Sequence, residues 1–301
     1  MRRLIAMLLL TVASRGQAQT EPCTPDLNPT ALERVSVTSQ RCGLRLQSYL
    51  RASGAELTGS VTIGIDARDA VRIVQNIAEP PFALLQTGDV IGAGRNGDSI
   101  YWGIWSTEGT LGVTGDRVDE SPRSLSAMPY VAGVPSKALP QADGLVRYGL
   151  IGAPFVISGS NNMYAPVANA DSRSVRIDPA PISGADLLVD FNARTAKLNL
   201  RFIVRGVPVE SAIELRQRKS PSLTFDEVDC EGATNCSTAT LNFYGKDAMH
   251  AGILLTVFYD RVMPQADWVA AHLANVSGKA AIALSRRDTF SFPPSPVIRQ
   301  R

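Results

Sequence analysis

Short runs of alternating apolar and polar residues, without long helices between them, constrain this chain most. In residues 195–204, Leu198, Leu200 and Phe202 lie at every second position, and polar residues lie between them. Successive side chains of a β-strand point to opposite faces, so this period of two predicts a strand with one buried face. Similar runs recur from residue 99 to residue 285. No amphipathic helix of about ten residues separates them, so a parallel sheet with helical crossovers fits poorly.

The connections between these runs are short and contain turn-forming residues. Residues 192–194 join two runs at hairpin spacing, and Gly206 and Pro208 lie between the next two. Many sequential antiparallel strands form a sandwich or a barrel, and a barrel leaves no exposed edge. The sequence therefore predicts an all-β, antiparallel, up-and-down β-barrel. The expected strands are residues 99–105, 144–151, 185–191, 195–204, 209–216, 238–244, 251–259 and 278–285.

The amino terminus has the pattern of a secretory signal peptide. Arg2 and Arg3 precede an uncharged apolar run over residues 4–12, and small residues lie before a cleavage position after Ala18. The run is far shorter than the ~20 residues that span a bilayer as a helix. An amphipathic first helix is the alternative, but its charge would lie at one end only. We expect residues 1–19 to be the signal-peptide segment and the chain to be exported to the periplasm or cell surface.

Four cysteines fit an oxidising compartment. They form two couples that are close in sequence, Cys23 with Cys42 and Cys230 with Cys236, although three connectivities are conceivable. We expect two disulfides with local pairing. A zinc site is disfavoured, because there are only two histidines and no close CxxC spacing. Residues 20–22 do not resemble a lipoprotein processing site, so Cys23 is not expected to carry a lipid anchor.

The rest of the chain divides into three segments. Residues 20–84 form a segment of uncertain structure: Thr30 and Glu33 have capping-box spacing, whereas residues 70–77 read equally as helix or strand. Residues 85–287 are expected to form the β-barrel domain, and residues 288–301 a Pro-rich tail.

Several motifs occur in order along residues 85–287. The first is Gly88-Asp89-Val90-Ile91-Gly92 leading into Tyr101-Trp102-Gly103-Ile104-Trp105, and the second is Met128-Pro129-Tyr130-Val131-Ala132-Gly133-Val134-Pro135. The expected strand over residues 144–151 follows, and then Asp186-Leu187-Leu188-Val189-Asp190-Phe191 with Lys197-Leu198-Asn199-Leu200. The last motif runs from Asn242-Phe243-Tyr244-Gly245 through Gly252 to Gly278-Lys279-Ala280-Ala281.

These motifs resemble the β-barrel of transferrin-binding-protein-B-like proteins. Related barrels are attached to FecR-domain proteins, where Trp-Gly-Arg-Trp is common and this chain has Ile104 in place of the arginine. The resemblance implies a small barrel of about eight strands, as on surface lipoproteins and solute-capturing modules. It does not imply transferrin binding, because the chain has room for one barrel only and no binding residue of the family is matched.

No motif predicts catalysis or a cofactor. Residues 92–97 satisfy GxGxxG, but strand-like residues follow where a dinucleotide site needs a helix, so we expect a Gly-rich turn. His250 and His272 lie near no nucleophile signature, which argues against a hydrolase. Residues 226–231 contain four carboxylates without EF-hand spacing and are interpreted as a solvated acidic loop. We therefore expect no enzyme activity, no cofactor and no metal.

The net charge of +2 over 301 residues gives no argument for a nucleic-acid partner. Tyr101, Trp105 and Tyr164 are the aromatic candidates for ligand contact; Tyr101 and Trp105 share one strand face, and a core role for this stretch is the favoured alternative.

The sequence predicts a non-catalytic binding or interaction module of the bacterial envelope. It would act through loops at one end of the barrel, with residues 107–126, 159–171 and 264–277 as candidates. The partner is either a small solute or an envelope protein. A structural accessory protein for envelope assembly is the alternative.

Overall fold

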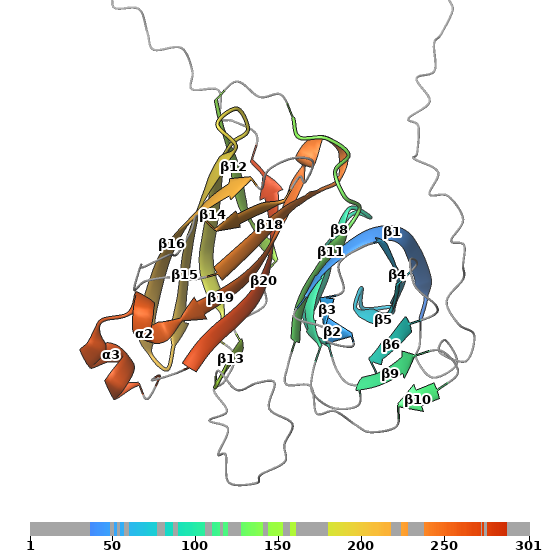
Figure 1. The fold of residues 1–301 in the computed structure, drawn as a ribbon, viewed down its shortest axis with the longest axis horizontal. Helices are drawn as coiled ribbons and strands as arrows, with labels where there is room; N and C mark the ends of the chain where they lie inside the picture. Colours follow the sequence, from blue (N-terminus) through green and yellow to red (C-terminus); the bar gives the residue numbers. More distant parts are fainter. Residues whose placement is uncertain are drawn as a thin grey trace, which may run out of the picture.

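The computed structural model describes a chain that is built mainly from antiparallel strands. The described residues are 37–48, 51–52, 55–56, 60–76, 82–86, 90–105, 110–114, 117–119, 128–140, 144–152, 157–160, 180–217, 224–227, 238–271, 273 and 276–287. Their strands form two nine-stranded sheets, which curl side by side (Figure 1), and a two-stranded ribbon. The all-β, antiparallel prediction is confirmed.

The first sheet contains the amino-terminal strands. Its order is β10-β9-β6-β5-β4-β1-β11-β8-β7. The strands are β1 (Ser39–Ser48), β4 (Ser60–Ile65), β5 (Val71–Asn76), β6 (Phe82–Gln86), β7 (Val90–Asn96), β8 (Ile100–Trp105), β9 (Thr110–Thr114), β10 (Arg117–Asp119) and β11 (Met128–Gly133), and the ribbon is β2 (Arg51–Ala52) with β3 (Ala55–Glu56).

An aromatic pair connects distant strands across the inside of the first sheet. Trp105 of β8 stacks on Tyr130 of β11, with ring centroids 4.4 Å apart. The indole N–H of Trp105 donates to the carbonyl oxygen of Val71 on β5 (2.8 Å), and the Tyr130 hydroxyl accepts from the Val71 amide (3.1 Å). Since β5 is not adjacent to β8 or β11 in the sheet, these bonds show that the sheet curls around a shared core.

The second sheet closes on itself. Its order is β12-β14-β15-β16-β17-β18-β19-β20-β13, and β12 also pairs with β20, so eight of these strands form a ring. The strands are β12 (Leu145–Gly152), β13 (Ile157–Ser160), β14 (Ile182–Asp190), β15 (Thr195–Val204), β16 (Val207–Gln217), β17 (Phe225–Glu227), β18 (Thr238–Tyr244), β19 (His250–Phe258) and β20 (Val276–Arg286), with the 3-10 turn η1 (Lys246–Ala248) after β18.

Apolar side chains fill the barrel along the described strands. In β15 the buried and exposed positions alternate as the sequence pattern predicts, with Leu198, Leu200 and Phe202 buried. Aromatic rings add to the packing, since Phe243 lies 5.7 Å from Tyr148 between ring centroids. An eight-stranded barrel is just wide enough for side chains to fill it. Other residues of this core are Leu187, Phe191, Phe225, Leu241, Ile253, Leu255, Ile282 and Leu284.

The barrel begins later in the chain than the sequence predicts. Residues 85–287 were expected to form it, but β7 to β11 belong to the first sheet, and the closed ring starts at Leu145. β11 pairs with β1, where Ala132 lies opposite Leu46. An alternating pattern defines the buried face of a strand but not its partner, so this pairing was not predictable.

Residues 71–76, for which the sequence predicts either a helix or a strand, form the strand β5.

The two sheets pack face to face through an apolar contact. Ile100 and Val131 of the first sheet meet Ala281 and Ala283 on the outer face of β20. The Trp102 ring lies against the backbone of Gly152 on β12, where an added Cβ would collide with the indole. Small residues on the barrel wall therefore let the first sheet approach closely.

The connection between the sheets is bonded to both of them. The Val134 amide donates to the Ser99 carbonyl (3.0 Å), and the Gly245 amide donates to the Val134 carbonyl (2.7 Å). The Ser136 hydroxyl donates to the Gly245 carbonyl oxygen (2.7 Å). The connection thus behaves as an extra short strand beside the end of β18 and fixes one sheet against the other.

Candidate functional site

Two short helices cover one end of the barrel. They are α2 (Tyr259–Val262) and α3 (Gln265–Ala270), which follow β19. Tyr259 is fully buried, and its ring packs against Phe202 of β15 with centroids 6.2 Å apart. Pro264 immediately precedes α3, a position where a missing amide hydrogen is tolerated. α2 therefore continues the apolar core at this end of the barrel, and α3, which has no buried residue, lies beside it (Figure 1).

The β15–β16 turn is tied to the end of α3. Arg205 lies in that turn with a φ of 48°, and its Nη1 donates to the carbonyl oxygen of Ala271 (2.8 Å). Ala271 is the C-cap residue of α3, so the bond satisfies a carbonyl that the helix leaves unpaired. The turn and the helix form one surface at this end of the barrel.

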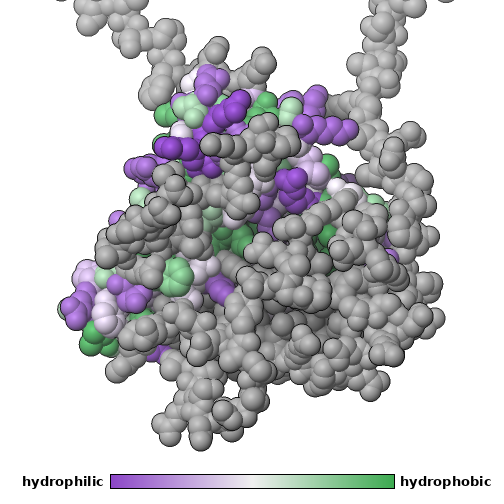
Figure 2. Space-filling view, viewed as in Figure 1, coloured by the Kyte–Doolittle hydropathy of each residue, from purple (hydrophilic) through white to green (hydrophobic). Residues whose placement is uncertain are grey.

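This surface exposes large apolar side chains. Ile203 on β15 is 53% exposed and Val269 on α3 is 51% exposed. Pro208, which is opposite Ile203 in the β15–β16 register, is also exposed. Figure 2 shows apolar and hydrophilic residues side by side over α3, at the lower left of the view. We call Ile203, Pro208 and Val269 the barrel-end patch.

Acidic residues flank the barrel-end patch. Asp260 in the first turn of α2 and Asp267 in the first turn of α3 are both exposed. Neither has an ion-pair partner within the described part of the chain. The surface thus combines exposed apolar groups with two exposed carboxylates and the exposed Arg205.

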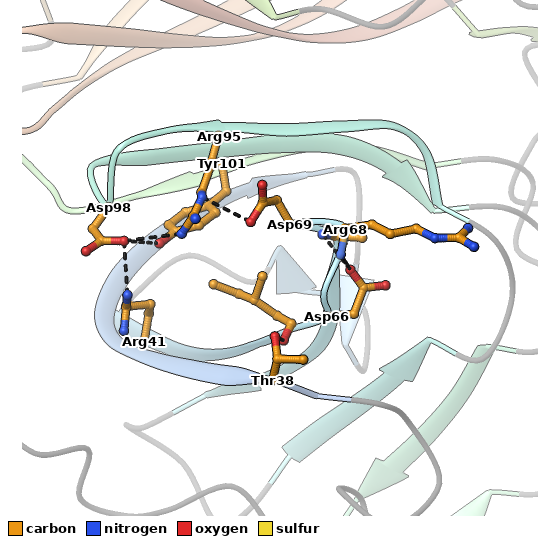
Figure 3. A network of polar contacts seen from close by, with 10 residues as sticks. Thr38, Arg41, Asp66, Arg68, Asp69, Arg95, Asp98 and Tyr101 are labelled. Atoms are coloured by element: carbon orange, nitrogen blue, oxygen red, sulfur yellow. Dashed lines mark hydrogen bonds and ion pairs between the residues drawn. The ribbon is translucent and has the colours of Figure 1, made fainter.

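A polar cluster links the β4–β5 turn to the β7–β8 turn of the first sheet (Figure 3). Asp98, in the β7–β8 turn, accepts from Arg41 Nη2 (3.0 Å) and from the Tyr101 hydroxyl (3.3 Å). Arg95 Nε lies 3.0 Å from Asp69 Oδ1 in the β4–β5 turn. The bond from Arg41 lowers the pKa of Asp98, whereas burial raises the pKa of Tyr101. These contacts join two hairpin turns of non-adjacent strands.

Asp66 organises the β4–β5 turn of this cluster. Its carboxylate accepts from the amides of Arg68 (2.8 Å) and Ala70 (3.0 Å) and from Arg72 Nε (2.7 Å). Burial opposes ionisation of Asp66, but the Arg72 bond and the two amide bonds outweigh it and lower its pKa. Because the carboxylates here are already paired with arginines or amides, we assign the cluster to holding the curled sheet closed.

Two of the three aromatic residues predicted to contact a ligand are buried in the core of the first sheet. Tyr101 and Trp105 share a face, as predicted, and both are core residues of the first sheet, 0% and 3% exposed. Their burial supports the core interpretation. Tyr164 lies outside the described residues.

The GxGxxG motif forms β7 and the turn after it. An added Cβ on Gly94 would lie 2.7 Å from the Trp102 ring, so this glycine serves close packing. Strand β8 follows directly, as the Gly-rich-turn interpretation expects.

Cysteines and histidines are only partly described. Cys42 lies on β1, its thiol is not free, and its Sγ accepts from the Thr62 hydroxyl (3.4 Å). Local disulfide pairing stays a prediction, because Cys23, Cys230 and Cys236 lie outside the described residues. His250 is buried, its Nδ1 has no hydrogen-bond partner among the described residues, and burial lowers its pKa. His272 and most of the acidic stretch 226–231 also lie outside the described residues, apart from β17.

The described residues contain neither a metal-binding cluster nor a membrane-spanning helix. No group of three or more His, Cys, Asp or Glu side chains there could hold a metal ion. Among those same residues, no helix is both long and apolar enough to cross a membrane.

Part of the barrel-end surface lies within a loop that is predicted from the sequence, and Ile203 lies outside it. Residues 264–277 were expected to be a loop, and the structure forms α3 within them. Ile203 was not singled out, although a signal existed: it occupies an outward position after Lys197, Asn199 and Arg201. Of the other candidate loops, residues 107–126 are described only as β9 and β10, and residues 159–171 only at the end of β13.

The fold defines a class of protein with a curled sheet packed on a closed eight-stranded barrel. Solved structures similar to the chain include transferrin-binding protein B from serogroup B Neisseria meningitidis (TM-score 0.36, 11% identity, 81% of this chain and 43% of that chain). Intact Ap-TbpB with its N and C lobes is another (0.38, 12%, 81% and 46%), and a surface lipoprotein is a third (0.34, 12%, 65% and 81%).

Two of these structures carry the name of transferrin-binding protein B, the family that the sequence motifs resemble. The chain spans less than half the length of the Neisseria and Ap-TbpB structures. No protein-family model matches the chain, and no curated protein matches its sequence.

Proposed function

We propose that this chain is an exported, non-catalytic protein-binding module of the bacterial envelope that contacts its partner through the barrel-end patch. The observation that carries the proposal is the exposure of Ile203 and Val269, each more than half accessible on two elements joined by the Arg205 bond. Exposed apolar side chains that cluster in this way are typical of interaction surfaces.

The packed barrel favours recognition on the outside of the molecule. Side chains such as Leu198, Ile253 and Leu284 are essentially inaccessible inside the ring. Barrels that carry a solute enclose a cavity, whereas a side-chain-filled barrel acts as a rigid scaffold. Of the two partner classes left open by the sequence, these observations support a protein.

The charge beside the patch indicates the chemistry of the partner. Asp260 and Asp267 are exposed next to the apolar residues. A complementary protein surface would present apolar or aromatic side chains in its centre and lysine or arginine at its rim. Such rim charges mainly speed association and select the partner, while the apolar centre supplies most of the affinity.

A site-specific photo-crosslinking experiment tests the proposal. A photoreactive amino acid replaces Val269 in one version of the chain. In the control version it replaces Asn199, which is exposed on the outer face of the barrel. Irradiation of the intact producing cells should give one discrete protein adduct from position 269 and none from position 199. Equal adducts from both positions, or an adduct from 199 alone, would contradict the proposal.

The alternative role as a structural accessory protein predicts a different result. A protein that assembles broadly with the envelope would crosslink over the barrel wall as well as at its end. The comparison between positions 199 and 269 therefore separates the two functions.

A further inference from the structure

Side-chain hydrogen bonds between β1 and β18 join the two sheets beside their apolar contact. On β1, Arg45 and Gln47 point toward the barrel, because Leu44 and Leu46 fill the core of the first sheet. Gln47 Nε2 donates to the Thr240 carbonyl oxygen (3.1 Å), and its Oε1 accepts from the Tyr244 hydroxyl at 2.6 Å. Both the nitrogen and the oxygen of the Gln47 side-chain amide thus bond the first sheet to the second.

Asn242 presents a fixed amide to Arg45. Arg45 Nη1 donates to Asn242 Oδ1 (2.8 Å), and the same oxygen accepts from the Thr224 hydroxyl (2.8 Å). Asn242 is only 5% exposed. Because arginine can only donate, the amide oxygen must face it, and the Asn242 NH₂ group points elsewhere. Within the described residues, that NH₂ group makes no hydrogen bond.

Arg45 differs from three other arginines of these sheets, Arg41, Arg72 and Arg147, in its charge partners. Arg41, Arg72 and Arg147 each lie within 3.0 Å of an aspartate oxygen. Arg45 is half-buried and has no carboxylate within ion-pair distance in the part of the chain that the structure describes. A partly desolvated guanidinium gains more from an anion than an exposed one does, because solvent screens it less.

We propose that Arg45 and Asn242 form a carboxylate-binding site at the junction of the two sheets. The guanidinium has several N–H groups beyond the one bonded to Asn242, and its fork matches the two oxygens of a carboxylate. The Asn242 amide oxygen holds the guanidinium in place through Nη1, which leaves its other N–H groups for the carboxylate. The carboxylate belongs either to a free small acid or to an acidic side chain of a peptide. This site is distinct from the barrel-end patch and does not depend on the proposed function.

Titration of the full chain with two probes tests the site. Malonate represents a free small acid, and an N-acetylated, C-amidated triglutamate peptide represents acidic side chains, with chloride at matched ionic strength as the reference. Binding is followed by calorimetry and by the NMR signal of the Arg45 side-chain N–H. We expect at least one probe to bind and to shift that signal, and two binding probes to compete.

Variants link the binding to Arg45. Arg45→Gln should weaken probe binding by about tenfold or more, as expected for loss of charge-assisted hydrogen bonds. Arg45→Lys keeps the charge but loses the fork and should give an intermediate affinity. Arg201→Gln, at an exposed arginine of the open barrel wall, is the matched control and should bind as the wild type does.

The source of the carboxylate follows from which probe binds. Binding of malonate alone indicates a small acid, and binding of the peptide alone indicates acidic side chains. The site is refuted if neither probe shifts the Arg45 signal in the wild-type chain, or if Arg45→Gln binds equally well. The wild-type NMR titration decides the matter even if the variant fails to fold.

Discussion

Trp105 donates its indole N–H to the carbonyl oxygen of Val71 at 2.8 Å and so bonds β8 to β5 across the interior of the first sheet. The ring also stacks on Tyr130, whose hydroxyl accepts from the Val71 amide. Both polar groups of one buried residue are therefore satisfied by side chains from strands that are not its neighbours. This relationship explains how a sheet with open edges keeps a curled, buried core with its polar groups paired.

Trp105→Phe should destabilise the chain by about 1–3 kcal/mol, because it leaves the buried Val71 carbonyl without its donor. Phenylalanine keeps one aromatic ring but is smaller than tryptophan, so a packing loss adds to the loss of the hydrogen bond. Urea unfolding at equilibrium measures it. An unchanged unfolding midpoint would show that this bond does not hold the sheet closed.

Gly152→Ala should loosen the contact between the sheets, because its Cβ would collide with the Trp102 ring. Overpacking of this kind costs about 1–3 kcal/mol. Trp102→Ala in the same chain should remove the collision, so the double variant should lose less stability than the two single effects added together. Strict additivity of the two changes in unfolding free energy would contradict the described contact.

Leu255→Ala should cost about 2–5 kcal/mol in unfolding free energy, as expected for truncation of a buried leucine in a packed core. Leu145→Ala is the matched control, since Leu145 is 59% exposed. Its effect should stay within about 0.5 kcal/mol. Similar small losses from both variants would indicate that the barrel interior is not filled.

His250 should make stability depend on pH. Burial lowers its pKa below the ordinary value of 6.5, so the unfolded chain binds a proton more readily than the folded chain. Its contribution to stability is complete above pH 6.5 and is lost as the pH falls below that value toward the folded-state pKa. His250→Gln should therefore lose less stability than the wild type between pH 8 and pH 5.5. Equal losses in thermal unfolding experiments would show that His250 does not titrate differently on folding.

The alternating pattern predicted which face of a strand is buried but not which strands pair. Leu198, Leu200 and Phe202 lie inside the barrel as predicted, and Tyr101 and Trp105 share a buried face. The assignment of the latter stretch to the barrel was wrong, because the same pattern suits the interior of either sheet. Register with a strand far away in sequence depends on packing that no local period encodes.

The proposed sites illustrate the same limit. Ile203 breaks a row of outward polar residues and so could have been identified from the sequence. Arg45 could not, because Asn242, its hydrogen-bond partner, is 197 residues away in the chain. Whether Arg45 has a carboxylate partner depends on strands that are far away in the sequence and meet it only in the folded chain.

Binding of the crosslinked partner, once purified, to wild-type chain and to an Ile203→Asp, Val269→Asp double variant tests the central claim most directly. Both side chains face solvent, so the variant should unfold at the same denaturant concentration as the wild type. Placing charges in an apolar contact is costly, and affinity measured by calorimetry should fall at least about tenfold. Unchanged affinity in a correctly folded double variant would show that the partner binds elsewhere.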